Sequence, residues 1–182
     1  MEGATPFESA GVWGVLATAV LALLYAGYLA RSILARDTGT PRMQSVAGAI
    51  RRGANTYLRT QFRSILFLIV VLTLALYLTA ALANQSLAIS LGRAGAFLMG
   101  SLFSATVGYM GMNMAVQGNI RVASAARRSF SEALRIGYRA GTITGMLTDG
   151  LGLFGGTLIF IIYGKMAPEV LLGFGFGGTL LA

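Results

Sequence analysis

Long stretches without a charged side chain constrain this sequence more than any other feature. Such runs cover residues 9–30, 64–83 and 94–119, and a fourth, 140–164, is interrupted only by Asp149. Since about 20 apolar residues in a helix cross a hydrocarbon core about 30 Å thick, each run predicts a membrane span. Charged residues make up only 11% of the chain, against about 25% in soluble domains, which indicates an integral membrane protein.

Two further apolar segments do not form complete spans. Between residues 43 and 63 the apolar side chains recur at helical spacing and arginines occupy the other face, which predicts an amphipathic helix leading into the span at 64–83. Residues 170–182 are too few to cross a membrane and predict the first half of a fifth helix. We therefore expect an all-α transmembrane fold with four spanning helices, in which residues 1–182 form one membrane domain.

Positive charge is concentrated in two connecting segments. Of the 14 Lys and Arg residues, twelve lie within 31–63 and 121–139, whereas Arg93 and Lys165 lie in other connections. Because Lys- and Arg-rich loops remain in the cytoplasm, we expect both segments to be cytoplasmic and the N-terminus to lie outside.

The arginines allow three interpretations: topology signals, contacts to the anionic headgroups of the lipid bilayer, or a polyanion site in the sequence RVASAARR, residues 121–128. Topology and lipid explain such clusters most simply. A nucleic-acid partner is excluded by their predicted position against the membrane.

Small residues recur at four-residue spacing, a pattern that lets membrane helices approach closely. The positions are Gly100, Ser104 and Gly108; Gly137, Gly141 and Gly145; Gly152 and Gly156; and Gly173 and Gly177. Gly173, Gly175 and Gly178 also spell G-x-G-x-x-G, the spacing of a dinucleotide-binding turn. That site requires a preceding strand, a following helix and an acidic residue about 20 positions on. The sequence around these glycines provides none of the three, so helix packing is the preferred interpretation.

Asp149 is the one ionisable residue deep in a predicted span, and we expect it to face the bundle beside a polar partner such as Thr144 or Thr148. It is a candidate intramembrane ion or proton site, or a hydrogen-bonded structural carboxyl. The chain has no histidine or cysteine, and its six acidic residues are scattered. No catalytic, substrate-binding or metal-binding residue can therefore be assigned.

Three segments together resemble the membrane-bound, ion-translocating inorganic pyrophosphatases, which pump protons or sodium. MQSVAGAIRRGANTYLRTQFRSI, residues 43–65, resembles the helix that leads into their second span. Residues 95–156 resemble their third and fourth spans, most specifically in GYMGMNMAV, GNIRVASAAR and GLGLFG, and the tail GFGFGGTLLA resembles the start of their fifth helix. Asp149 departs from the family pattern, which has an apolar residue there.

The resemblance implies the N-terminal, outer-ring part of a bundle of about sixteen helices in a prokaryotic plasma membrane. The whole enzyme would be a homodimer that hydrolyses magnesium pyrophosphate on the cytoplasmic side and exports ions. Its ligands for substrate and Mg²⁺ lie in helices that follow these residues, so the chain by itself is expected to be inactive. The alternative from another functional class is a stand-alone membrane scaffold or oligomeric channel with Asp149 in its pore.

Overall fold

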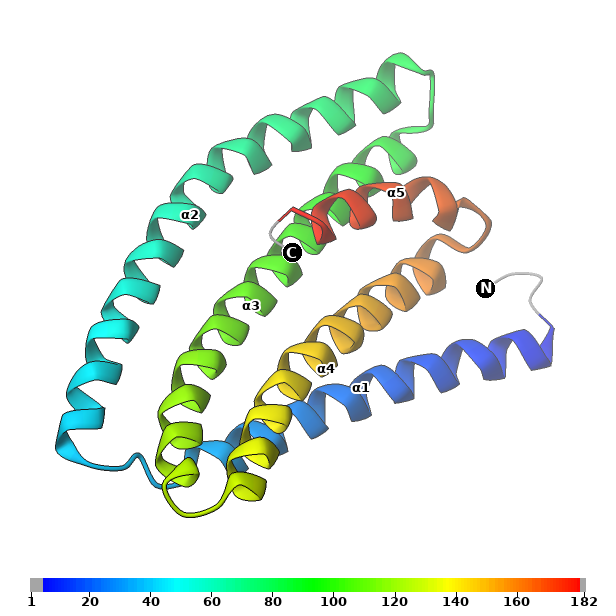
Figure 1. Ribbon diagram of the computed structural model, residues 1–182. Helices are drawn as coiled ribbons and strands as arrows, with labels where there is room; N and C mark the ends of the chain where they lie inside the picture. The colour runs from blue at the N-terminus through cyan, green and yellow to red at the C-terminus, as the bar shows by residue number, and fades with distance from the viewer. Residues whose placement is uncertain (1–4, 181–182) are drawn as a thin grey trace.

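The computed structural model describes residues 5–180 and contains helices without any strand in that range. The helices are α1 (Pro6–Leu34), α2 (Pro41–Leu82), α3 (Leu87–Ala126), α4 (Phe130–Tyr163) and α5 (Ala167–Gly178), with one 3-10 turn, η1 (Gly164–Met166). Helix α3 packs against α2, α4 and α5, while α1 packs mainly against α4 (Figure 1). The all-α prediction is confirmed.

Each long helix begins at a capping residue that the sequence supplies. Thr5, Thr40, Ser86 and Ser129 each accept a hydrogen bond from the backbone N–H three residues later. These hydroxyls satisfy donors that have no partner inside the helix. Proline occupies the first turn of both α1 and α2, where its fixed φ angle suits a helix start.

Four apolar helical segments are long enough to cross a membrane: Pro6–Leu34, Pro41–Leu82, Leu87–Ala126 and Phe130–Gly178. Each span predicted from the sequence lies within one of them, to within one residue at its ends. Helix α2 has 42 residues and so measures about 63 Å, roughly twice the thickness of a hydrocarbon core. Its arginine-bearing half is therefore continuous with the span but extends beyond the hydrocarbon.

The largest buried apolar cluster joins the arginine-rich halves of α1, α3 and α4. It contains Ala26, Leu29, Ile33, Ala125, Ala133, Ile136, Ile143 and Leu147. Toward their other ends α1 and α4 diverge, and they border an apolar groove of about 790 Å³. The groove therefore separates α1 from α4 only at the end away from the arginine-rich segments.

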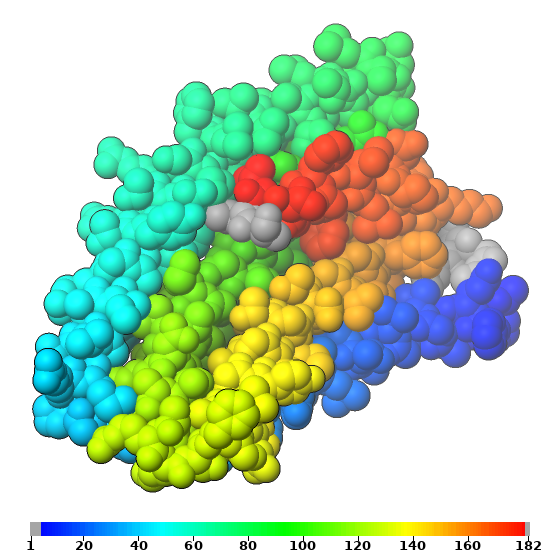
Figure 2. All heavy atoms as spheres, in the orientation of Figure 1, coloured from blue at the N-terminus to red at the C-terminus, as the bar shows by residue number. Residues whose placement is uncertain are grey.

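The chain reverses at Gly164, whose φ angle of +52° favours glycine, and α5 then packs back onto α3. Figure 2 shows α5, in red and orange, on this face of the molecule beside the end of α4. A β-carbon on Gly173 would lie 2.0 Å from the Arg93 carbonyl oxygen, and one on Gly177 would lie 2.2 Å from the Phe97 oxygen. The two backbones can approach this closely only because these positions lack side chains.

The tail glycines therefore serve helix packing, as predicted, but only one position of the G-x-G-x-x-G pattern contributes. Added β-carbons on Gly175 and Gly178 would meet nothing within 4 Å, so Gly173 and Gly177 form the packing pair. Gly100 on α3 completes the contact, since a β-carbon there would lie 2.3 Å from the Phe174 oxygen.

The glycine pattern in α4 has a different outcome. Gly141, Gly145 and Gly152 are exposed and have open space where a side chain would be. The predicted close packing of these three positions is therefore not made by any described helix of this chain.

Candidate functional site

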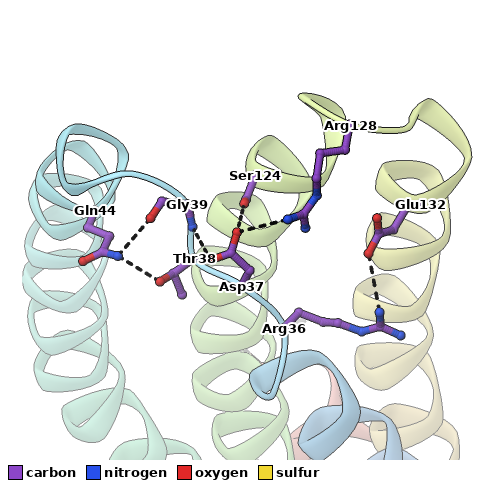
Figure 3. A network of polar contacts seen from close by, with 8 residues as sticks. All are labelled: Arg36, Asp37, Thr38, Gly39, Gln44, Ser124, Arg128 and Glu132. Carbon is purple, nitrogen blue, oxygen red and sulfur yellow. Dashed lines mark hydrogen bonds and ion pairs between the residues drawn. The ribbon is translucent and has the colours of Figure 1, made fainter.

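The most developed polar site lies where the α1–α2 connection meets the last turns of α3 (Figure 3). Asp37 accepts hydrogen bonds from the Gly39 backbone N–H at 3.1 Å and from the Ser124 hydroxyl at 2.6 Å. The first bond folds the connection locally, and the second ties it to α3. Gly39 has a φ angle of +73°, which a residue with a side chain rarely adopts.

The same contacts set the charge state of this carboxyl. The hydrogen bond from Ser124 lowers the pKa of Asp37 below its ordinary value of 3.8, and the Gly39 N–H lowers it further. Arg128 adds a smaller lowering of the pKa through an ion pair at 3.7 Å, in which both side chains are more than half exposed. Asp37 is therefore a carboxylate that accepts hydrogen bonds, and it has no features of a general acid.

Arg121 is the one charged residue of the described chain that is buried, with only 6% of its surface exposed. Its guanidinium donates at 2.9 Å to the Leu34 carbonyl oxygen, and at 2.8 and 2.9 Å to the backbone and side-chain oxygens of Gln117. Leu34 ends α1, where carbonyl groups lack helical partners and positive charge is favourable. Arg121 on α3 thus provides a hydrogen-bond donor for the carbonyl group at the C-terminal end of α1.

A second ion pair joins the α1–α2 connection to α4. Arg36 Nη1 lies 3.5 Å from Glu132 Oε1, with both side chains partly exposed (Figure 3). Exposed pairs of this length contribute little, on the order of 0–1 kcal/mol. The pair therefore orients the connection more than it stabilises it.

At the opposite end of the molecule, Arg93 of α3 holds the first turn of α5. Its guanidinium donates to Glu169 Oε2 at 2.7 Å and to the Glu169 carbonyl oxygen at 3.1 Å. The Arg93 side chain is only 15% exposed. This shorter and better shielded contact fixes the place where α5 folds back.

Asp149 takes no part in either polar site. It is exposed on α4, on the same face as Gly145 and Gly152, and has no hydrogen bond to the described residues. Within residues 5–180 no helix covers Asp149 and neither Thr144 nor Thr148 bonds it, so the expected polar partner is not supplied by these helices. The reason is rotational, since α4 presents Ile143 and Leu147 to the buried cluster and Asp149 falls on another side.

Residues 5–180 contain no group of three or more His, Cys, Asp or Glu side chains that could hold a metal ion. Each carboxylate of this range other than Asp149 has an arginine or hydroxyl partner. The two polar sites can position helices, but they offer neither a nucleophile with its base nor a metal centre.

Sequence reasoning missed how RVASAARR is used. Arg121 binds the last carbonyl group of α1, while Arg128 and Ser124 bind the carboxylate of Asp37, so most of this segment is occupied internally. The available signal was Asp37 itself, an acidic residue within an arginine-rich segment. Its partner could not be read from the sequence because the two are 87 positions apart.

Together these features define a polytopic helical membrane protein whose polar side chains join helix ends. Residues 20–182 match the family described as inorganic H+ pyrophosphatase, so the chain belongs to that family. It corresponds to the N-terminal portion of its relatives.

The chain is 48% identical to the K(+)-insensitive pyrophosphate-energized proton pump of Chloroflexus aurantiacus, over 100% of this chain and 25% of the relative. It is 42% identical to the protein of the same name from Streptomyces avermitilis, over 94% of this chain and 22% of the relative. A third relative is the pyrophosphate-energized membrane proton pump 3 of Arabidopsis thaliana, at 36% identity over 92% and 24% of the two chains. The chain thus spans about a quarter of the length of the curated relatives it matches.

Proposed function

We propose that this chain is the N-terminal, outer part of a pyrophosphate-energised proton pump. The observation that carries the proposal is the family match over residues 20–182, together with relatives that are named as proton pumps. Those names favour protons over sodium and independence from K⁺. In the whole protein, hydrolysis of pyrophosphate drives proton export, and the four long helices brace the helices that carry out the chemistry.

The residues present favour a structural role for this part of the protein and a catalytic role for the remaining helices. The polar contacts at both ends join helices to one another, and the described part offers no metal cluster. Mg²⁺ and pyrophosphate are therefore proposed to bind on the remaining helices of the same polypeptide. Two copies of the whole protein are proposed to form a homodimer, whose mass native mass spectrometry would measure.

The activity test compares two proteins. The whole protein, reconstituted in vesicles, should hydrolyse magnesium pyrophosphate and acidify the compartment into which it pumps, with the same rate in Na⁺ or K⁺ buffers. The purified 182-residue chain should show no hydrolysis above a blank. Hydrolysis by the short chain, or a requirement for K⁺ in the whole protein, would contradict the proposal.

The arginine-rich segments are proposed to lie in the cytoplasm of a prokaryotic cell, and the N-terminus outside the plasma membrane. The chain lacks cysteine, so single cysteines can be introduced without background labelling. Asn84→Cys, between α2 and α3, should react with a membrane-impermeant maleimide in intact cells. Arg51→Cys should react only after the cells are opened, and the reverse pattern would refute this orientation.

Asp149 is proposed as an intramembrane polar site that the remaining helices cover. It lies on an exposed face of α4 beside glycines that leave room for close approach. Asp149→Asn in the whole pump should lower proton transport per pyrophosphate hydrolysed. An unchanged ratio of transport to hydrolysis would remove Asp149 from the ion path.

A further inference from the structure

A polar pocket of about 280 Å³ lies between the last turn of α1 and the first turns of α4. Three arginines line it: Arg36 from the α1–α2 connection, and Arg135 and Arg139 from α4. Ser32, Ser129, Ser131, Glu132, Ile33 and Ile136 complete the lining. At about 30 Å³ per water, the pocket has room for roughly nine waters, or for a phosphate group and part of its hydration shell.

The positive charge of this pocket is not balanced by the chain. Glu132 is the only carboxylate in the lining, and it pairs with Arg36 at 3.5 Å (Figure 3). Arg135 and Arg139 have no carboxylate partner among the described residues. They are four positions apart on one helix, where like charges repel unless an anion lies between them.

The other lining groups suit a phosphate oxygen. Ser129 and Ser131 place hydroxyl donors at the N-terminal end of α4, a 34-residue helix whose dipole favours negative charge there. Ile33 and Ile136 also line the pocket and are buried in the apolar cluster of α1, α3 and α4, so this side of the pocket is formed by protein interior. Donors, excess charge and an enclosed side therefore coincide at one place.

We propose that this pocket binds one phosphate-type anion, held between the guanidinium groups of Arg135, Arg139 and Arg36 and the two α4 hydroxyls. The chemistry is that of a phosphate bearing net negative charge, whether it belongs to an anionic lipid headgroup or to free phosphate. Occupancy would tie the end of α1 to the start of α4. None of its lining side chains bonds to Asp37, whose arginine partner is Arg128.

The test uses the full 182-residue chain in a neutral detergent, titrated with dioctanoyl phosphatidylglycerol or inorganic phosphate and followed by calorimetry. The pocket variant is Arg135→Gln/Arg139→Gln. The matched control is Arg51→Gln/Arg52→Gln, which removes the same charge from exposed positions on α2 outside the pocket. Far-UV circular dichroism checks that each variant keeps its helix content.

We expect one saturable site per chain, weakened tenfold or more in the pocket variant and less than threefold in the control. Binding of phosphatidylglycerol alone assigns a lipid headgroup, and comparable binding of inorganic phosphate assigns a free anion. Equal weakening in both double variants, or no saturable binding of either probe, would overturn the proposal.

A gain-of-affinity variant keeps the test decisive if the pocket variant fails to fold. Glu132→Gln removes the only carboxylate of the lining and frees Arg36, so it should tighten binding severalfold. Unchanged or weaker binding by Glu132→Gln would count against the site.

Discussion

Replacing Gly177 by alanine should loosen α5 from α3, even though alanine is the better helix former. The added β-carbon would lie 2.2 Å from the Phe97 carbonyl oxygen and 2.7 Å from the Ser101 nitrogen. A carbon–oxygen contact normally needs about 3.3 Å, so the helices must separate by about 1 Å at this point. Both obstructing atoms belong to the α3 backbone, which cannot move aside as a flexible side chain would.

The magnitude follows from two opposing effects. Overpacking at a close contact costs about 1–3 kcal/mol, and a glycine-to-alanine change in a helix returns up to about 1 kcal/mol. Gly175→Ala is the matched control, because its β-carbon would meet nothing within 4 Å. The propensity gain is common to both variants, so their difference isolates the steric cost, about 1–3 kcal/mol.

Hydrogen exchange with mass spectrometry measures this difference directly. If α5 exchanges through local opening, its amides should exchange about 5- to 150-fold faster in Gly177→Ala than in Gly175→Ala. Peptides from α1 should be unaffected because α1 makes few contacts with this part of the molecule. Equal exchange of α5 in the two variants would show that the α3–α5 contact is looser than the structure has it.

Three further perturbations test the polar contacts. Arg121→Gln should lower the free energy of unfolding by about 2–3 kcal/mol, since it removes a buried charged donor, whereas the exposed Arg127→Gln should change it little; chemical denaturation compares the two. Folding lowers the pKa of Asp37 below its ordinary value of 3.8, so its carboxylate stabilises the fold fully above pH 3.8 and loses this effect as the pH falls through the folded-state pKa. The difference in melting temperature between the parent chain and Asp37→Asn should therefore shrink only below pH 3.8. A double-mutant cycle with Arg93→Gln and Glu169→Gln should give a coupling of about 1 kcal/mol, because the pair is short and partly shielded, and zero coupling would contradict the geometry.

The fold could be predicted from local signals because membrane helices satisfy their own backbone. A run such as 64–83 has little choice but to be helical in hydrocarbon, where every N–H and C=O needs an internal partner. The caps Thr40 and Ser129, and the prolines in the first turns of α1 and α2, mark where helices begin. The continuous α2 followed from the absence of a breaker between its amphipathic and apolar halves.

The rotation of each helix about its axis was harder to predict from the sequence. Gly173 and Gly177 were recognised as a packing pair, yet the same spacing at Gly141 and Gly145 leads to an exposed face. Small residues permit close approach wherever a neighbour exists, and spacing alone does not say where the neighbour is. Asp149 likewise lies on a face of α4 that no described helix covers.

The sequence by itself determined the class of this protein: an all-helical membrane chain with charge segregated to one end. It also carried the segments that place the chain in the inorganic H+ pyrophosphatase family. These properties depend on composition and short-range order along one helix, so they are legible without contacts.

Only the tertiary structure decided which polar groups meet. Asp37 with Ser124, Arg121 with Leu34, and the arginines around the α1–α4 pocket come from segments far apart in the chain. Their pairing depends on the register and rotation of packed helices, which close backbone contacts such as those between α3 and α5 help to fix. Local sequence carries no such information, because many registers satisfy the same apolar pattern.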